Sequence, residues 1–68
     1  MRMKILLNGV EHEIESPVSL ADLLEVAGYA GRRVAVEVNR EIVPRSRYPQ
    51  HALAAGDRIE IVHAIGGG

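Results

Sequence analysis

The side chains in this sequence that could perform chemistry are few, and their spacing does not form a catalytic set. The three histidines, His12, His51 and His63, lack the spacing of metal ligands. Glu11 and Glu13 flank His12, but side chains alternate between faces along a strand, so these carboxylates point away from the imidazole. The chain has no cysteine, which excludes disulfides and thiol nucleophiles. Because no nucleophile stands beside a base, we expect neither a catalytic site nor a metal site.

The glycine run Gly66, Gly67 and Gly68, which ends the sequence, is the other feature with chemical meaning. Glycine loses the most conformational freedom on ordering and has no side chain to bury, so this run does not help a domain to fold. Glycine does permit close approach of the backbone to a narrow site. We therefore expect a flexible tail over residues 66–68 that serves another protein, attached to a folded domain over residues 1–65.

The length and composition of the chain limit the classes of protein to which it can belong. With 68 residues, 47% of them hydrophobic, the chain is one small domain without room for a deep cavity. No apolar run is long enough to span a membrane. The apolar stretch within the N-terminal segment MRMKILLNGVEHE is too short for a signal peptide, so we expect a cytoplasmic protein. Residues 32–47 hold five arginines against two glutamates, which is too mixed for a nucleic-acid surface. They form either an ordinary solvated surface or a basic patch for an acidic partner.

The segment MKILLNGVEHEIE (residues 3–15) predicts a β-hairpin. Asn8-Gly9 between apolar runs is typical of a type I′ turn, which needs positive φ at both central residues. Leu7 then faces Val10, and alternation predicts one inward apolar face, which includes His12 and, on the last strand, His63. A histidine there is more often partly buried and hydrogen-bonded than catalytic, whereas His51 is expected to be exposed.

The segment SPVSLADLLEVAG (residues 16–28) predicts the main helix. Ser19 is the N-cap, Asp22 lies near the positive end of the helix dipole, and Gly28 is the expected stop. The stripe of apolar residues that should face the sheet has the spacing i, i+3, i+4, i+7. It consists of Leu20, Leu23, Leu24 and Ala27.

Two further segments predict the rest of the sheet. RVAVEVNREIVP (residues 33–44) predicts a strand with three inward valines, a turn near Asn39-Arg40, and a short edge strand before Pro44. A short helical turn is expected around residues 49–53, and RIEIVHAI (residues 58–65) predicts the last strand. The first and last strands are the most apolar, so they should be central neighbours. The order predicts an α+β, β-grasp fold, with a mixed four- to five-stranded sheet and one main helix across one face.

Four segments, MKILLNG, VSLADLLE, RVAVEVNREIVPRS and GDRIEIVHAIGGG, together resemble the ThiS family of thiamine-biosynthesis sulfur carriers. The resemblance runs in register over almost the whole chain and implies a ubiquitin-like fold. It implies that the Gly68 carboxylate is adenylated, converted to a thiocarboxylate, and used to deliver sulfur for thiazole formation, with Gly67 as the penultimate residue of a diglycine motif.

The same resemblance implies the partners. They are a ThiF-like adenylating enzyme that uses ATP and Mg²⁺, the thiazole synthase ThiG, and a sulfur donor such as a cysteine desulfurase. The chain itself would be a protein cosubstrate with no bound cofactor.

Two positions depart from the family pattern: Arg40 stands where Gly is common, so a strained or looped second hairpin is expected, and Ala64 replaces a bulky apolar residue. A MoaD-like carrier for molybdopterin synthesis and a ubiquitin-like or TGS-type binding module are the alternatives.

A partner must recognise more than three glycines, so we expect an interface around the root of the tail. Leu6, Val62 and Ala64 fall by alternation on the sheet face opposite the helix, where Leu6 and Val62 are expected to be neighbours. An exposed apolar patch of this kind often marks a binding surface, unless Leu6 and Val62 only stabilise strand pairing. The expected interface consists of Leu6, Val62, Ala64, Ile65, Arg45 and Arg47, with the arginines as a polar rim.

Overall fold

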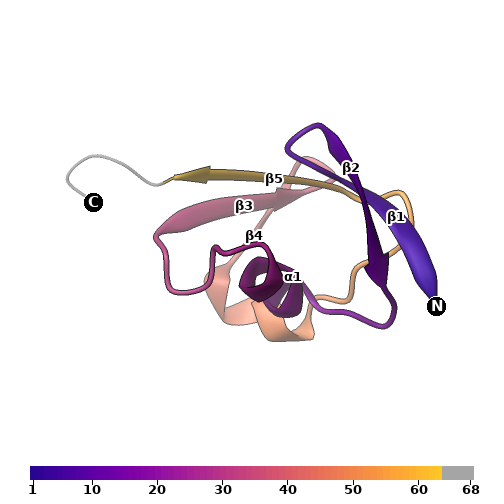
Figure 1. Ribbon diagram of the computed structural model, residues 1–68. Coiled ribbons are helices and arrows are strands. Elements are labelled where there is room, and N and C mark those ends of the chain that lie inside the picture. Colours follow the sequence, from indigo (N-terminus) through magenta and orange to yellow (C-terminus); the bar gives the residue numbers. More distant parts are fainter. Residues whose placement is uncertain (64–68) are drawn as a thin grey trace.

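The computed structural model describes residues 1–63 as a five-stranded sheet with helices on one face (Figure 1). The sheet order is β2-β1-β5-β3-β4, with β1 parallel to β5 and the other neighbours antiparallel. The expected α+β architecture, with the first and last strands as neighbours, is confirmed. The elements are β1 (Arg2–Leu7), β2 (Val10–Glu15), α1 (Leu20–Val26), β3 (Val34–Val38), β4 (Glu41–Val43), the 3-10 helix η1 (Arg45–Gln50) and β5 (Arg58–His63).

The first hairpin forms as its turn residues predict. Asn8 and Gly9 have φ values of 50° and 82°, and Leu7 is opposite Val10. The inward face is only partly as expected, because Val10 is 58% exposed and His12 is also exposed. β2 is an edge strand, and the helix packs under the middle of the sheet, so alternation alone overstated the burial of β2.

Helix α1 is positioned by its N-terminal cap. The Ser19 hydroxyl accepts a hydrogen bond from the Asp22 backbone N–H at 3.1 Å, and the Asp22 carboxylate accepts one from the Ser19 N–H at 3.3 Å. Leu20, Leu23 and Leu24 are at most 4% exposed. The expected fourth member of the stripe is wrong: Ala27 is exposed, because it is the C-cap residue where the helix ends. Gly28 follows with a φ of 87°, as expected for a helix stop.

The second hairpin closes through a two-residue turn, not a longer loop. Val38 is opposite Glu41, and Asn39 and Arg40 both adopt left-handed backbone conformations, with φ values of 52° and 70°. The strain expected at Arg40 is therefore present, since a side chain disfavours this region. The Asn39 side chain stabilises the turn by accepting from the Arg58 N–H at 3.0 Å and donating to the Asp57 carboxylate at 2.9 Å.

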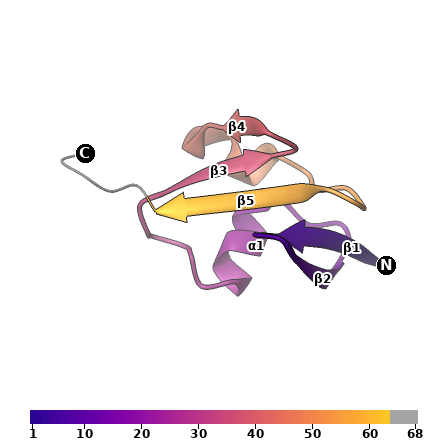
Figure 2. The same ribbon diagram turned by 90° about the horizontal axis from the view of Figure 1, so that it is seen from above.

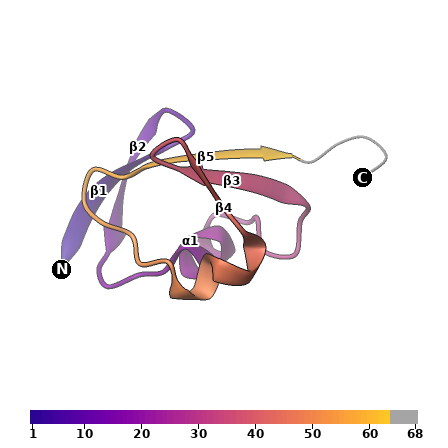
Figure 3. The ribbon, with the colours of Figure 1, turned by 180° about the vertical axis from the view of Figure 1, so that it is seen from behind.

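Helices α1 and η1 lie under the same face of the sheet (Figure 3). The expected helical turn around residues 49–53 is displaced: η1 spans Arg45–Gln50, because Pro44 has extended backbone and the helix begins directly after it. η1 contributes the buried Tyr48 to the core, and Leu53 is also buried there. Burial raises the pKa of the Tyr48 phenol above its ordinary value, and the nearby Arg45 charge partly opposes this.

Candidate functional site

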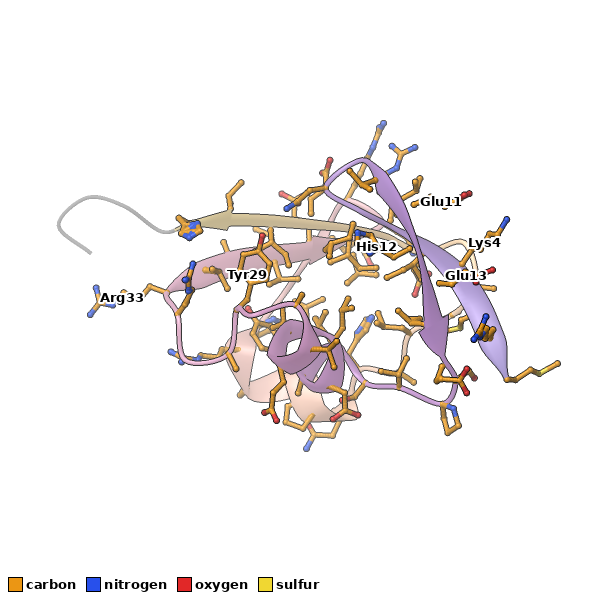
Figure 4. All side chains as sticks on the ribbon, in the orientation of Figure 1. Lys4, Glu11, His12, Glu13, Tyr29 and Arg33 are labelled. Atoms are coloured by element: carbon orange, nitrogen blue, oxygen red, sulfur yellow. The ribbon has the colours of Figure 1, made fainter. Side chains whose placement is uncertain are left out.

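Strand β5 is the last described element before the glycine run in the sequence. Ile59 and Ile61 are at most 7% exposed, which anchors this strand in the core. His63, the last described residue, is exposed, so its expected burial is wrong, and so is the exposure expected for the half-buried His51. Figure 4 shows Tyr29 beneath this end of β5, and the Tyr29 and His63 rings meet edge to face at 6.2 Å between centroids. Ala64, Ile65, Gly66, Gly67 and Gly68 lie outside the described residues.

Three apolar side chains gather on the sheet face opposite the helices, and we call Ala35, Ile42 and Val62 the open-face patch. Val62 is 63% exposed and Ile42 is 72% exposed. Together with Ala35 they line a shallow hollow of about 370 Å³, bordered by the polar residues Asn8, Glu37 and Glu60. This exposed apolar surface includes Val62, next to the last residue of β5, and exposed apolar patches often mark binding surfaces.

The structure separates Leu6 from this patch. Leu6 pairs with Arg58 in the β1–β5 ladder, four residues before Val62 along β5. At about 3.3 Å per residue, these positions are roughly 13 Å apart along the strand. Leu6 is half-buried and lines a different hollow with Arg40 and Arg58. The expected direct neighbourhood of Leu6 and Val62 is therefore wrong, because β1 reaches only the first half of β5.

The two arginines expected at the rim lie on different sides of η1. Arg47 is exposed and lines a hollow of about 390 Å³ at β4, which also includes Ile42, but it does not line the hollow of the open-face patch. Arg45 lies in another hollow with Tyr29 and Tyr48, under the helix-covered side. Sequence reasoning missed Ala35 and Ile42 as parts of the surface. The signal was available, because each alternates with a buried valine, Val36 or Val43.

The described part of the chain offers little for catalysis. Within residues 1–63, no three side chains of histidine, aspartate or glutamate come together as a metal site would need. Ser19 is engaged in the helix cap and not beside a base. No helix among these residues has the length and apolar character needed to cross a membrane.

Sequence comparison identifies what kind of domain this is. The profile of the ThiS family matches residues 5–68. This chain belongs to the ThiS family. It is 32% identical over 66 residues to the sulfur carrier protein ThiS of Escherichia coli K12, which covers 97% of this chain and 100% of that protein.

Two further similarities extend this result. A crystal structure of the thiamine biosynthesis protein ThiS from Geobacter metallireducens superposes with a TM-score of 0.85 at 26% identity, covering 97% of this chain and 100% of that one. The expected β-grasp fold is thereby confirmed. The thiazole synthase of Paramagnetospirillum magneticum is 47% identical over 97% of this chain, and the chain spans 20% of the length of that protein.

Proposed function

We propose that this chain is a sulfur carrier of thiamine biosynthesis, with a folded domain over residues 1–65 and a glycine tail over residues 66–68. The observation that carries the proposal is the ThiS-family match, which extends through Gly68. The similarity to the thiazole synthase supports the link to thiazole formation. In this role the chain is a cosubstrate of other enzymes, and the cytoplasmic location expected from the sequence belongs to the same proposal.

The chemistry takes place at the carboxylate of Gly68. One carboxylate oxygen attacks the α-phosphorus of ATP, expels pyrophosphate and leaves an acyl-adenylate. A sulfur nucleophile at the oxidation level of sulfide then attacks the acyl carbon, AMP departs with the oxygen, and a thiocarboxylate remains. A ThiF-like enzyme supplies the ATP and Mg²⁺ chemistry. A donor such as a cysteine desulfurase supplies the sulfur as a persulfide, which a thiol must reduce by two electrons to release it at the sulfide level. Thiazole synthase, ThiG, receives it, and glycine lets the backbone enter each site closely.

Recognition of the domain is assigned to the surface next to the tail. The open-face patch supplies an apolar centre, and Arg47 supplies a charged border at β4. Ala64 and Ile65 belong to the proposed interface because they connect β5 to the glycines in sequence. Arg45 and Leu6 lie on separate parts of the surface and are assigned peripheral contacts.

The proposal is tested by the intact mass of the protein after incubation with a ThiF-type enzyme, ATP and a sulfur donor. Replacement of one carboxylate oxygen by sulfur adds about 16 Da. The mass should increase only when all three components are present. A ubiquitin-like binding module without carrier function would keep its original mass under every condition, and that outcome would overturn the proposal.

The position of the terminal carboxylate gives a sharper prediction. Adding one alanine after Gly68, or deleting Gly68, should abolish ATP–pyrophosphate exchange, because the acyl carbon must sit at a fixed depth beside the nucleotide. The fold should be unaffected, since both changes fall outside the core residues. Circular dichroism melts control for folding. Exchange near the unmodified rate by either variant would contradict a role for the Gly68 carboxylate.

A further inference from the structure

The central strand β5 is paired unequally along its two edges. β3 pairs with it over five residues, from Val38 opposite Ile59 to Val34 opposite His63. β1 pairs with it at two positions only, Leu6 with Arg58 and Leu7 with Ile59. Figure 2 shows the same arrangement from above, with β3 alongside β5 and β1 beside its first half. Within residues 1–63, the second half of β5 thus has a neighbouring strand on one side only.

Asn8 marks the point at which the pairing with β1 ends. The Asn8 N–H donates to the Ile59 carbonyl at 2.9 Å, as a continuing strand would. The next bond is different, because the Ile61 N–H donates to the side-chain Oδ1 of Asn8 at 2.8 Å. The chain has already turned at Asn8-Gly9 toward β2, so a side-chain oxygen takes the place of a strand carbonyl.

Beyond Asn8, the backbone groups of Ile61 and His63 face the side that β1 has left. The Asn39 N–H donates to the Arg58 carbonyl at 2.8 Å, so Arg58 directs its backbone groups to β3. By the alternation of an antiparallel ladder, Val62 does the same, while Ile61 and His63 direct theirs to the opposite edge. No backbone or side-chain group within residues 1–63 bonds to the Ile61 carbonyl or the His63 N–H. His63 is exposed, so its N–H lies at an accessible edge.

We propose that this free edge of β5, at Ile61 and His63, pairs with an extended segment of the adenylating enzyme and so fixes the register of the tail. The inference rests on the carrier function proposed above. An unpaired strand edge is a template for another strand, and backbone pairing supplies affinity without needing particular side chains. The sheet of the carrier thereby continues into its partner at the place where the tail begins.

The position of the free β5 edge, close in sequence to Gly68, favours the adenylating enzyme as its partner. Five residues follow His63, so the Gly68 carboxylate lies within about 17 Å of the edge, even in a fully extended chain. Any enzyme that reacts with it must approach this end of β5. A slip of one residue in a strand register moves the chain by about 3.3 Å and reverses its faces. Pairing at Ile61 and His63 therefore sets how deeply the carboxylate enters the enzyme.

The test compares two proline variants made at exposed strand edges. His63→Pro removes the N–H at the free edge of β5 and costs no hydrogen bond within residues 1–63. The matched control is Glu11→Pro on β2, whose N–H points away from β1 because the neighbouring Val10 pairs with Leu7 next to a two-residue turn. His63→Pro should weaken calorimetric binding to a ThiF-type enzyme by about tenfold or more. Glu11→Pro should bind as the unmodified chain does.

A second measurement isolates the backbone from the imidazole ring. A backbone ester at His63, made by chemical ligation, keeps the ring and replaces only the N–H, and it should weaken binding in the same direction as the proline. The His63 amide should exchange rapidly with solvent in the free carrier and at least about tenfold more slowly in the complex. The Val62 amide, already directed to β3, should change little.

The outcomes separate this inference from the carrier function. If the unmodified chain gains no sulfur mass, the carrier function fails. If it does gain sulfur while His63→Pro and the ester bind normally, or the His63 amide exchanges equally fast in the saturated complex, the edge-pairing inference fails alone. Sedimentation of the free chain tests whether a second copy of the chain occupies the edge instead. A dimer that dissociates in the His63→Pro variant would assign the edge to a second copy and overturn the inference.

Discussion

At the scale of single residues, Arg40 carries the clearest local strain. Its φ of 70° places a residue with a Cβ in the left-handed region, which costs about 1–2 kcal/mol relative to glycine. Glycine also gains entropy in the unfolded chain, which offsets part of that difference. We therefore expect Arg40→Gly to increase the free energy of unfolding by about 0.5–1 kcal/mol, measured by urea denaturation.

The control for this prediction separates backbone strain from charge. Arg40 lines the same hollow as Arg58, so removing its charge could stabilise the turn through lower repulsion. Arg40→Ala removes the charge but keeps the Cβ, and it should give no comparable gain. Equal stabilisation by both variants would assign the effect to charge and contradict the interpretation based on φ.

At the scale of elements, α1 holds the sheet through a short apolar stripe. Leu23 is 4% exposed, whereas Val26, in the same helix, is 87% exposed. Leu23→Ala should lower the free energy of unfolding by about 2–5 kcal/mol, because truncation leaves a cavity between helix and sheet. Val26→Ala is the matched control and should change it by less than about 0.5 kcal/mol. A loss below about 1 kcal/mol for Leu23→Ala would mean that the core repacks around the missing side chain.

The elements were predictable where local residues determine local geometry. Asn8-Gly9 specifies its turn, and Ser19 with Asp22 specifies the helix start, so both were located correctly from sequence. The burial of His12 and His63 was not predicted correctly. It depends on how far α1 extends beneath the sheet and how far β1 extends beside β5. The same cause separates Leu6 from Val62. Alternation assigns a face to each residue, but only the register between strands determines which residues on that face meet.

At the scale of the whole molecule, the two sheet faces differ in what covers them. One face is covered by α1 and η1, while the other exposes the open-face patch beside the start of the tail. Three glycines offer a partner no side chains, so discrimination between carriers must come from the body of the domain. The proposed interface therefore lies on the face away from the core, so substitutions there should change binding without changing stability.

The last prediction uses that separation. Val62→Asp places a charge at the centre of the open-face patch and should weaken binding to a ThiF-type enzyme by at least about tenfold, or 1.4 kcal/mol. Val26→Asp puts the same charge on the exposed end of α1 and should leave binding unchanged. Because Glu37 and Glu60 border the patch, Val62→Asp also adds like charge, so a melt must accompany the titration. Val62→Thr removes apolar surface without charge and should weaken binding less, in the same direction. Unchanged affinity for a folded Val62→Asp variant would exclude this face from the interface and direct attention to the arginine-rich segment 40–47.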